Sequence, residues 1–221
     1  MARTENTAAP PNASGALRMR AVNLREEFQG FAMASRPPEN PVHDYDLNLS
    51  HGAQLMAARL GYRIFPATPE SMEERLRTTA CPEPSHALIT KWWSGENRSC
   101  PIMAALGPSN VTVVEIENSK DTAGFESLAR WEDLFGPLPR TRIVRTPTGF
   151  QIHMRGSTSA PHESLGNGLR LLSVYRGVFL PGTNLGERGL YRWLRVDALR
   201  DAPNWVLGRR IKAPRGERAS Q

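Results

Sequence analysis

The sequence is poor in cysteine and has no long apolar run. Its two cysteines, Cys81 and Cys100, exclude a disulfide framework and are typical of a reducing compartment. No apolar stretch reaches the roughly 20 residues that span a bilayer, and none follows Met1 as a signal peptide would. The sequence therefore predicts a soluble, cytoplasmic protein that does not enter a membrane.

Two common kinds of site are also missing from the sequence. Cys81, His86 and Cys100 could indicate zinc, but their spacing contains no C-x-x-C pair and no fourth ligand, so we expect no zinc site. The GxxxxGK[ST] loop that holds nucleotide phosphates in P-loop ATPases is absent as well. Zinc-finger and P-loop mechanisms are therefore not expected here.

What the chain does have is positive charge. Its 28 lysines and arginines exceed its 22 acidic residues, which gives a net charge of +6 and a pI of about 9.9. This charge favours a polyanionic partner such as nucleic acid. Because no helix-turn-helix or zinc-finger pattern could recognise base edges, we expect any such binding to depend on phosphate contacts.

The length of 221 residues fits one domain with extensions. Residues 1–45 are rich in proline and small polar residues, which predicts an irregular arm. Residues 208–221 are polar and basic, which predicts a disordered tail. Residues 46–207 remain as the folded domain.

Helical and strand patterns alternate through this domain, which indicates the α/β (α+β) class. Helices are expected at 50–60, around Trp92 and Trp93 in the core, and from Asp121 as N-cap to a stop at Gly136. Strands are expected at 62–65, 102–106, 111–116, 141–145, 151–155, 169–173, 177–180 and 190–194, with 169–173 and 177–180 forming a hairpin.

Two acidic residues end the strand predicted at 111–116. Glu115 and Glu117 are two residues apart, so their side chains project from the same face, roughly 7 Å apart along the chain. Paired carboxylates suit Mg²⁺ or Mn²⁺, whose shell is completed by nucleotide phosphates in phosphoryl-transfer sites. The alternative is a solvated strand end with two exposed acids.

Short blocks follow one another in a fixed order around this strand. They are a Gly61-to-Pro66 strand, a tryptophan at 92 or 93, Glu115 and Glu117, Leu138-Pro139-x-Thr141, Thr146-Pro147-Thr148-Gly149, a strand with His153, Pro181-Gly182-Thr183, and Tyr191. The ordered set covers roughly residues 50–195 and resembles the N-terminal domain of bifunctional DNA primase-polymerases, of the archaeo-eukaryotic primase superfamily.

The resemblance implies a primase-polymerase-like fold with a central mixed β-sheet flanked by helices. It also implies that Glu115 and Glu117 bind divalent metal, with a third acid nearby, and that His153 contacts the incoming triphosphate beside Thr148 and Gly149. Nucleic acid, in particular DNA in single-stranded form, and nucleotides would be its partners. A helicase, if one takes part, would be encoded separately.

The sequence departs from the family pattern in three ways. Glutamates replace aspartates at 115 and 117, which lengthens each carboxylate arm by one methylene. His153 stands one residue late in its block, and a one-residue slip turns a strand side chain to the opposite face unless the turn absorbs an insertion. Arg170 occupies the position expected for the third acid, where its charge would repel metal or pair with the glutamates.

The sequence leaves three functional hypotheses. The first is a primase-polymerase-like domain of replication or mobile-element origin, from a plasmid or prophage, with a degenerate active site that retains nucleic-acid or nucleotide binding. The second is an active metal-dependent nucleotidyltransferase in which Glu163 or Asp121 supplies the missing ligand and His153 orients the γ-phosphate. The third is an unrelated α/β binding module.

Overall fold

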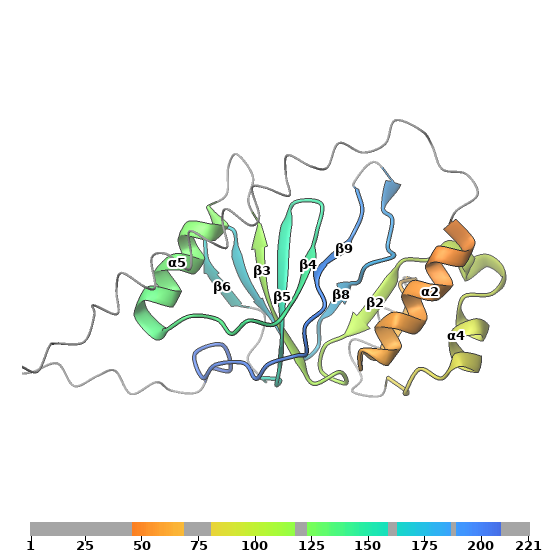
Figure 1. The fold of residues 1–221 in the computed structure, drawn as a ribbon, viewed down its shortest axis with the longest axis horizontal. Coiled ribbons are helices and arrows are strands. Elements are labelled where there is room, and N and C mark those ends of the chain that lie inside the picture. The colour runs from red at the N-terminus through yellow and green to blue at the C-terminus, as the bar shows by residue number, and fades with distance from the viewer. Residues whose placement is uncertain (1–45, 69–80, 118–122, 159–162, 187–188, 209–221) are drawn as a thin grey trace, which may run out of the picture.

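A computed structural model describes residues 46–68, 81–117, 123–158, 163–186 and 189–208. The predicted N-terminal arm, Asp121 and all but the first residue of the predicted tail lie outside these ranges. The described residues form an α+β fold, as the sequence predicts, with the strands gathered at the centre and helices at both ends (Figure 1).

The helices begin and end near the residues expected. They are α2 (Asp46–Arg59), α4 (His86–Trp92), the short 3₁₀ helix η1 (Gly95–Ser99) and α5 (Gly124–Phe135). The Ser85 side chain caps α4 by accepting a hydrogen bond from the Leu88 amide, and Gly136 ends α5 with a positive φ of 92°. None of the described helices is long and apolar enough to cross a membrane.

Two helix starts differ from the prediction. Helix α2 begins at Asp46 rather than Ser50, one turn earlier. The N-cap of α5 is Ala123, which makes no side-chain capping bond. The start of α5 depends instead on close packing, since a Cβ at Gly124 would collide with the carbonyl oxygens of Glu117 and Gly168. Short-range capping patterns could not reveal this contact.

The strands form two sheets in which every pairing between named strands is antiparallel. The single parallel contact among the described residues is an isolated bridge between Arg155 and Asp201, so the expected central mixed sheet is an antiparallel one. The larger sheet has the order β6 (Glu163–Gly166), β7 (Leu169–Leu172), β3 (Val111–Glu117), β5 (Gly149–Arg155), β4 (Arg142–Arg145) and β9 (Arg192–Arg195). The smaller has the order β1 (Ile64–Pro66), β2 (Ile102–Ala105) and β8 (Gly177–Phe179).

The two faces of the larger sheet bury different cores. Val114, Ile116 and Ile152 face α5 and pack with Leu128 and Trp205. On the opposite face, a second cluster joins this sheet to the smaller sheet, α2 and α4; it includes Val113, Leu172, Tyr62, Ile89 and Trp93. Burial of Trp93 and partial burial of Trp92 confirm the expected core role of this pair.

The predicted hairpin between residues 169–173 and 177–180 is wrong. Strand β7 pairs with β3 in the larger sheet, whereas β8 pairs with β2 in the smaller one. The chain changes sheets at a turn in which Tyr175 has a φ of 68°. Alternating apolar residues predict both strands correctly but carry no information on which sheet each strand joins.

Candidate active site

Glu115 lies in the middle of a row of three polar side chains that crosses the larger sheet. It is in register with Arg170 on β7 and with Gln151 on β5. Arg170 Nη2 lies 3.0 Å from Glu115 Oε2 and 3.4 Å from Glu117 Oε2, while Gln151 Nε2 donates to Glu115 Oε1 at 3.2 Å. The expected meeting of both glutamates with Arg170 is therefore confirmed, and both carboxylates bind the same guanidinium nitrogen.

A cavity of about 330 Å³ opens beside this row, at the junction between the two sheets. Its polar lining includes Glu115, Gln151, Arg170 and Arg176. Its apolar lining comes mainly from the smaller sheet and includes Met103, Val178, Phe179 and, from outside the strands, Tyr191. Arg170 is neutralised by its two glutamates, so Arg176 is the guanidinium of this lining that remains for an anionic ligand.

His153 is not part of this cavity lining. It lies on the same face of β5 as Gln151 but one pair deeper, opposite Val113, and its side chain is completely buried. Its Nδ1 is 2.8 Å from the hydroxyl of Tyr62. Burial, reinforced by the positive charge of Arg142, lowers the pKa of His153 to about 3, so the imidazole is neutral at physiological pH.

The histidine belongs to a buried polar cluster between the sheets, which we call the His153 cluster: His153, Tyr62, Arg142 and Trp193. The Arg142 guanidinium lies over the Tyr62 ring at 5.2 Å and donates to the carbonyl oxygen of Leu60 at 3.2 Å. Burial raises the pKa of Tyr62 to about 12, although Arg142 partly opposes the shift. In this structure the cluster stabilises the junction of the two sheets and does not reach the cavity.

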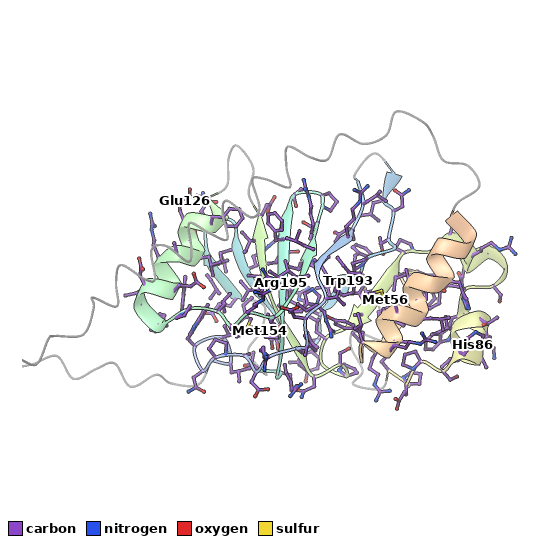
Figure 2. The ribbon with its side chains drawn as sticks, viewed as in Figure 1. Met56, His86, Glu126, Met154, Trp193 and Arg195 are labelled. Atoms are coloured by element: carbon purple, nitrogen blue, oxygen red, sulfur yellow. The ribbon has the colours of Figure 1, made fainter. Side chains whose placement is uncertain are left out.

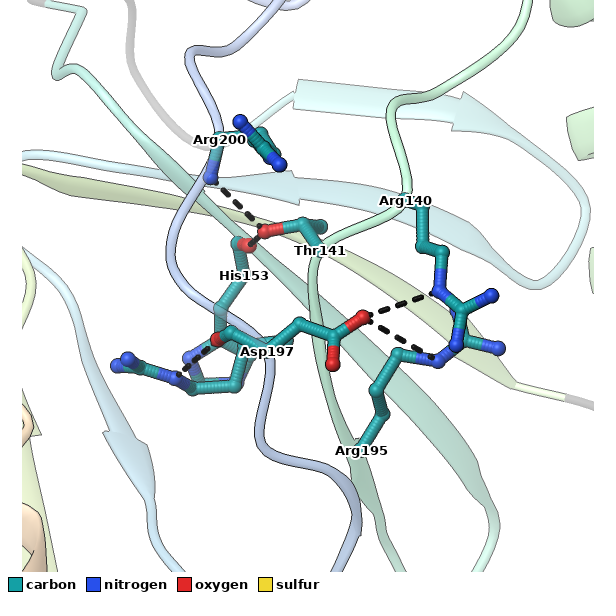
Figure 3. Close-up of polar contacts among 7 residues, drawn as sticks. Arg140, Thr141, His153, Arg195, Asp197 and Arg200 are labelled. Atoms are coloured by element: carbon teal, nitrogen blue, oxygen red, sulfur yellow. Dashed lines mark hydrogen bonds and ion pairs between the residues drawn. The ribbon is translucent and has the colours of Figure 1, made fainter.

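Asp197 connects the His153 cluster to the surface (Figure 3). Its backbone carbonyl accepts a hydrogen bond from Arg142 Nε at 3.3 Å, and its carboxylate pairs with Arg140 at 3.1 Å and with Arg195 at 4.0 Å. Thr141 ties the same region together, because its hydroxyl donates to the carbonyl of His153 and accepts from the Arg200 amide. These contacts hold the edge of the sheet in place.

Thr148 and Gly149 lie at the end of the sheet beside Glu117. Gly149 is in register with Glu117, and Thr148 is exposed in the preceding turn. A Cβ at Gly149 would collide with the carbonyl oxygen of Ile116, so only glycine allows this close approach of backbones. The predicted role of these two residues in nucleotide binding stays a prediction.

The residues present do not fit a site built for divalent metal. Glu115 and Glu117 supply oxygens, but the Arg170 guanidinium contacts both carboxylates. Among the described residues, no group of three or more His, Cys, Asp or Glu is placed to hold a metal ion. Glu163 is in register with Leu171, so it belongs to the face of the sheet opposite Arg170 and Glu115.

Two polar residues of the cavity lining, Gln151 and Arg176, were not predicted from the sequence. Gln151 was not singled out, although its position two residues before His153 places it on the same face of a strand. Arg176 follows the turn between β7 and β8, and no local pattern could connect it to Glu115 because the two lie in different elements.

Figure 2 shows His86 at the outer edge of the fold and Trp193 in its interior.

Comparison with known proteins gives one family. None of the curated proteins compared with the chain matches it. The sequence profile described as bifunctional DNA primase/polymerase, N-terminal (Prim-Pol) matches residues 53–205, which is more than half of the chain and includes Glu115, Glu117, His153 and Arg170. The hypothesis of an unrelated binding module is therefore wrong, and the protein belongs to the Prim-Pol family.

Proposed function

We propose that this Prim-Pol domain has weakened or lost nucleotidyl transfer and retains binding of nucleic acid and nucleotides. The observation that supports the proposal is the position of Arg170, whose guanidinium contacts both acidic residues at 3.0 and 3.4 Å. The family resemblance places a third metal-binding acid at this position. A cation therefore stands where the reaction requires an anion.

The positive charge of Arg170 opposes the binding of a metal ion at this site. Near a protein surface, two like unit charges 4 Å apart repel by about 4 kcal/mol, and the repulsion is doubled for a divalent ion. A metal ion would also compete with Arg170 for the same oxygen atom of each glutamate. Nucleotidyl transfer depends on metal ions that neutralise the developing charge, so their weak binding would lower the rate of the chemical step.

An arginine at position 170, in place of an acid, leaves a surface suited to phosphate. Arg170 and Arg176 both line the cavity, and Arg176 has no ion-pair partner among the described residues. Guanidinium groups bind phosphate through paired hydrogen bonds. Binding of DNA, in particular single strands, is consistent with this lining and with the net charge of +6. A replication or mobile-element origin and a separately encoded helicase also belong to the proposal and rest on the family alone.

One observation favours the second candidate, an active enzyme with a variant Glu-x-Glu site. The Oε1 atom of Gln151 is buried and has no hydrogen-bond partner among the described atoms. The amide nitrogen of the same side chain faces Glu115, so rotation of Arg170 toward solvent and a flip of the Gln151 amide would bring three oxygen-bearing side chains together on neighbouring strands. Such a set could hold Mg²⁺ or Mn²⁺, which prefer oxygen ligands.

Primer extension and de novo synthesis in the presence of Mg²⁺ and of Mn²⁺ distinguish the candidates. The wild type is compared with the double variant Glu115→Ala, Glu117→Ala. Equal background in both proteins, together with retained oligonucleotide binding, supports the degenerate domain. Synthesis by the wild type at rates typical of polymerases, abolished in the double variant, would establish the active enzyme instead.

A further inference from the structure

The turn between β7 and β8 holds an exposed tyrosine in an unfavourable backbone conformation. Tyr175 has a φ of 68°, and its side chain is 59% exposed. Glycine adopts this left-handed conformation without penalty, whereas a residue with a Cβ loses about 1 kcal/mol. With more than half of its surface exposed, the ring gains little packing that could offset this cost. A residue kept at a strained, exposed position points to a role outside folding.

The turn is fixed on both sides of Tyr175. Ser173 is buried and hydrogen-bonds with Thr112 and Thr158. Val174 packs so closely on Gly107 that a Cβ there would lie 2.9 Å from its Cγ2 atom. The amide of Arg176 donates to the carbonyl of Ser173, and its own carbonyl accepts from Leu106. The backbone that carries Tyr175 is therefore held in place on both sides.

Arg176 joins this turn to the cavity. Its side chain is exposed, lines the cavity with Arg170, and has no hydrogen-bond or ion-pair partner in the part of the chain that the structure describes. An aromatic ring and an unpaired guanidinium on successive residues match the two parts of one nucleotide unit, because a base stacks on the ring while a phosphate pairs with the guanidinium.

We infer that Tyr175 and Arg176 form a binding site for single-stranded nucleic acid, in which Tyr175 stacks on a nucleobase and Arg176 binds the adjoining phosphate. This inference deepens the proposed function and rests on its claim of nucleic-acid binding. Single strands are specified because a base within a duplex is stacked on both faces and does not offer one to a side chain. The site lies at the edge of the cavity and needs no metal ion.

Fluorescence anisotropy with a labelled 20-nucleotide oligothymidylate tests the site, with a duplex of equal length and the free thymidine nucleotide as competitors. The key variant is Tyr175→Gly, which removes the ring and relieves the strain, so it should fold at least as well as the wild type. Stacking on one base supports a loss of single-strand affinity of about 5- to 150-fold in this variant. Tyr175→Phe keeps the ring and should bind like the wild type.

Arg176→Ala should weaken binding and reduce the slope of log affinity against log salt by about 0.7. Arg130→Ala is the matched control, because Arg130 is an exposed arginine on α5, against the opposite face of the sheet. If the wild type binds single strands but Tyr175→Gly binds equally well, or if Arg130→Ala weakens binding as much as Arg176→Ala does, this site is wrong and the proposed function stands. Preference for the duplex would overturn the site too. If the wild type binds no nucleic acid at all, the binding part of the proposed function fails with it.

Discussion

Arg170 and Glu115 occupy directly opposed positions on β7 and β3, with 3.0 Å between Nη2 of the arginine and Oε2 of the glutamate. Glu117, two residues further along β3, contacts the same nitrogen at 3.4 Å. The pair is partly exposed, so it contributes little to the stability of the fold. Its importance lies in the site, because it directs a positive charge at the oxygens that would hold a metal ion.

Gly149→Ala should destabilise the domain, because the added Cβ meets the carbonyl of Ile116 on the neighbouring strand. Overpacking of this kind costs about 1–3 kcal/mol or more in the free energy of unfolding. Gly52→Ala is the control: Gly52 lies in α2 with open space around its Cα, and alanine there should add about 0.5–1 kcal/mol. Urea unfolding of both variants checks the prediction. Equal stability of the two would contradict the packing of β5 against β3.

Arg142→Ala should destabilise the domain by about 2–3 kcal/mol, because the buried guanidinium donates to the carbonyls of Leu60 and Asp197. Because Arg142 is buried, we expect it not to bind phosphate, and oligonucleotide binding should survive the substitution. Thermal unfolding of the variant, with oligonucleotide binding measured well below the melting temperature, tests both points. Unchanged stability with lost binding would contradict this prediction and indicate that Arg142 contacts phosphate.

His153 should make the stability of the domain depend on pH. Its pKa is about 3 in the folded protein and about 6.5 when unfolded, so the unfolded chain binds more protons between these values. The stabilisation is complete above pH 6.5 and is lost as the pH falls toward 3. Between pH 7.5 and 5.5 the wild type should lose about 1.4 kcal/mol more than His153→Gln. Parallel pH profiles of the two proteins would mean that His153 is accessible to protons.

Removal of residues 208–221 should reduce the salt dependence of nucleic-acid binding. This segment contains five lysines and arginines and one glutamate. Each phosphate that a basic residue neutralises on a single strand contributes about 0.7 to the slope of log affinity against log salt. Anisotropy titrations at several salt concentrations measure the slope for the full chain and for the truncated one. An unchanged slope would show that the segment takes no part in binding.

Much of the fold could be predicted from the sequence, because helices and buried strands leave local periodic patterns. The strand that ends in Glu115 and Glu117, the strands β4 and β5, and the stop of α5 at Gly136 were all expected and are confirmed. Strand β6 was missed because its four residues are mostly exposed and carry no alternating pattern. The partition of β7 and β8 into different sheets depends on long-range pairing, which periodicity does not encode.

The candidate site was predicted only in part, for a similar reason. The meeting of Arg170 with the glutamates followed from the order of the family's motifs and is confirmed. The contacts of the buried His153 could not be predicted, since Tyr62 and Arg142 come from distant segments of the chain. The contribution of Arg176 depends on a turn whose geometry the amino-acid types alone do not reveal.

A calorimetric titration of Mn²⁺ into the wild type and Arg170→Asp tests most directly whether Arg170 takes the place of the metal. We expect no saturable binding to the wild type below about millimolar Mn²⁺. Affinity should rise at least about tenfold in the variant, whose acid would complete the ligand set of Glu115 and Glu117 as a metal site requires. Tight binding by the wild type, unchanged or weakened by Arg170→Asp, would contradict the claim that Arg170 stands in the place of the metal.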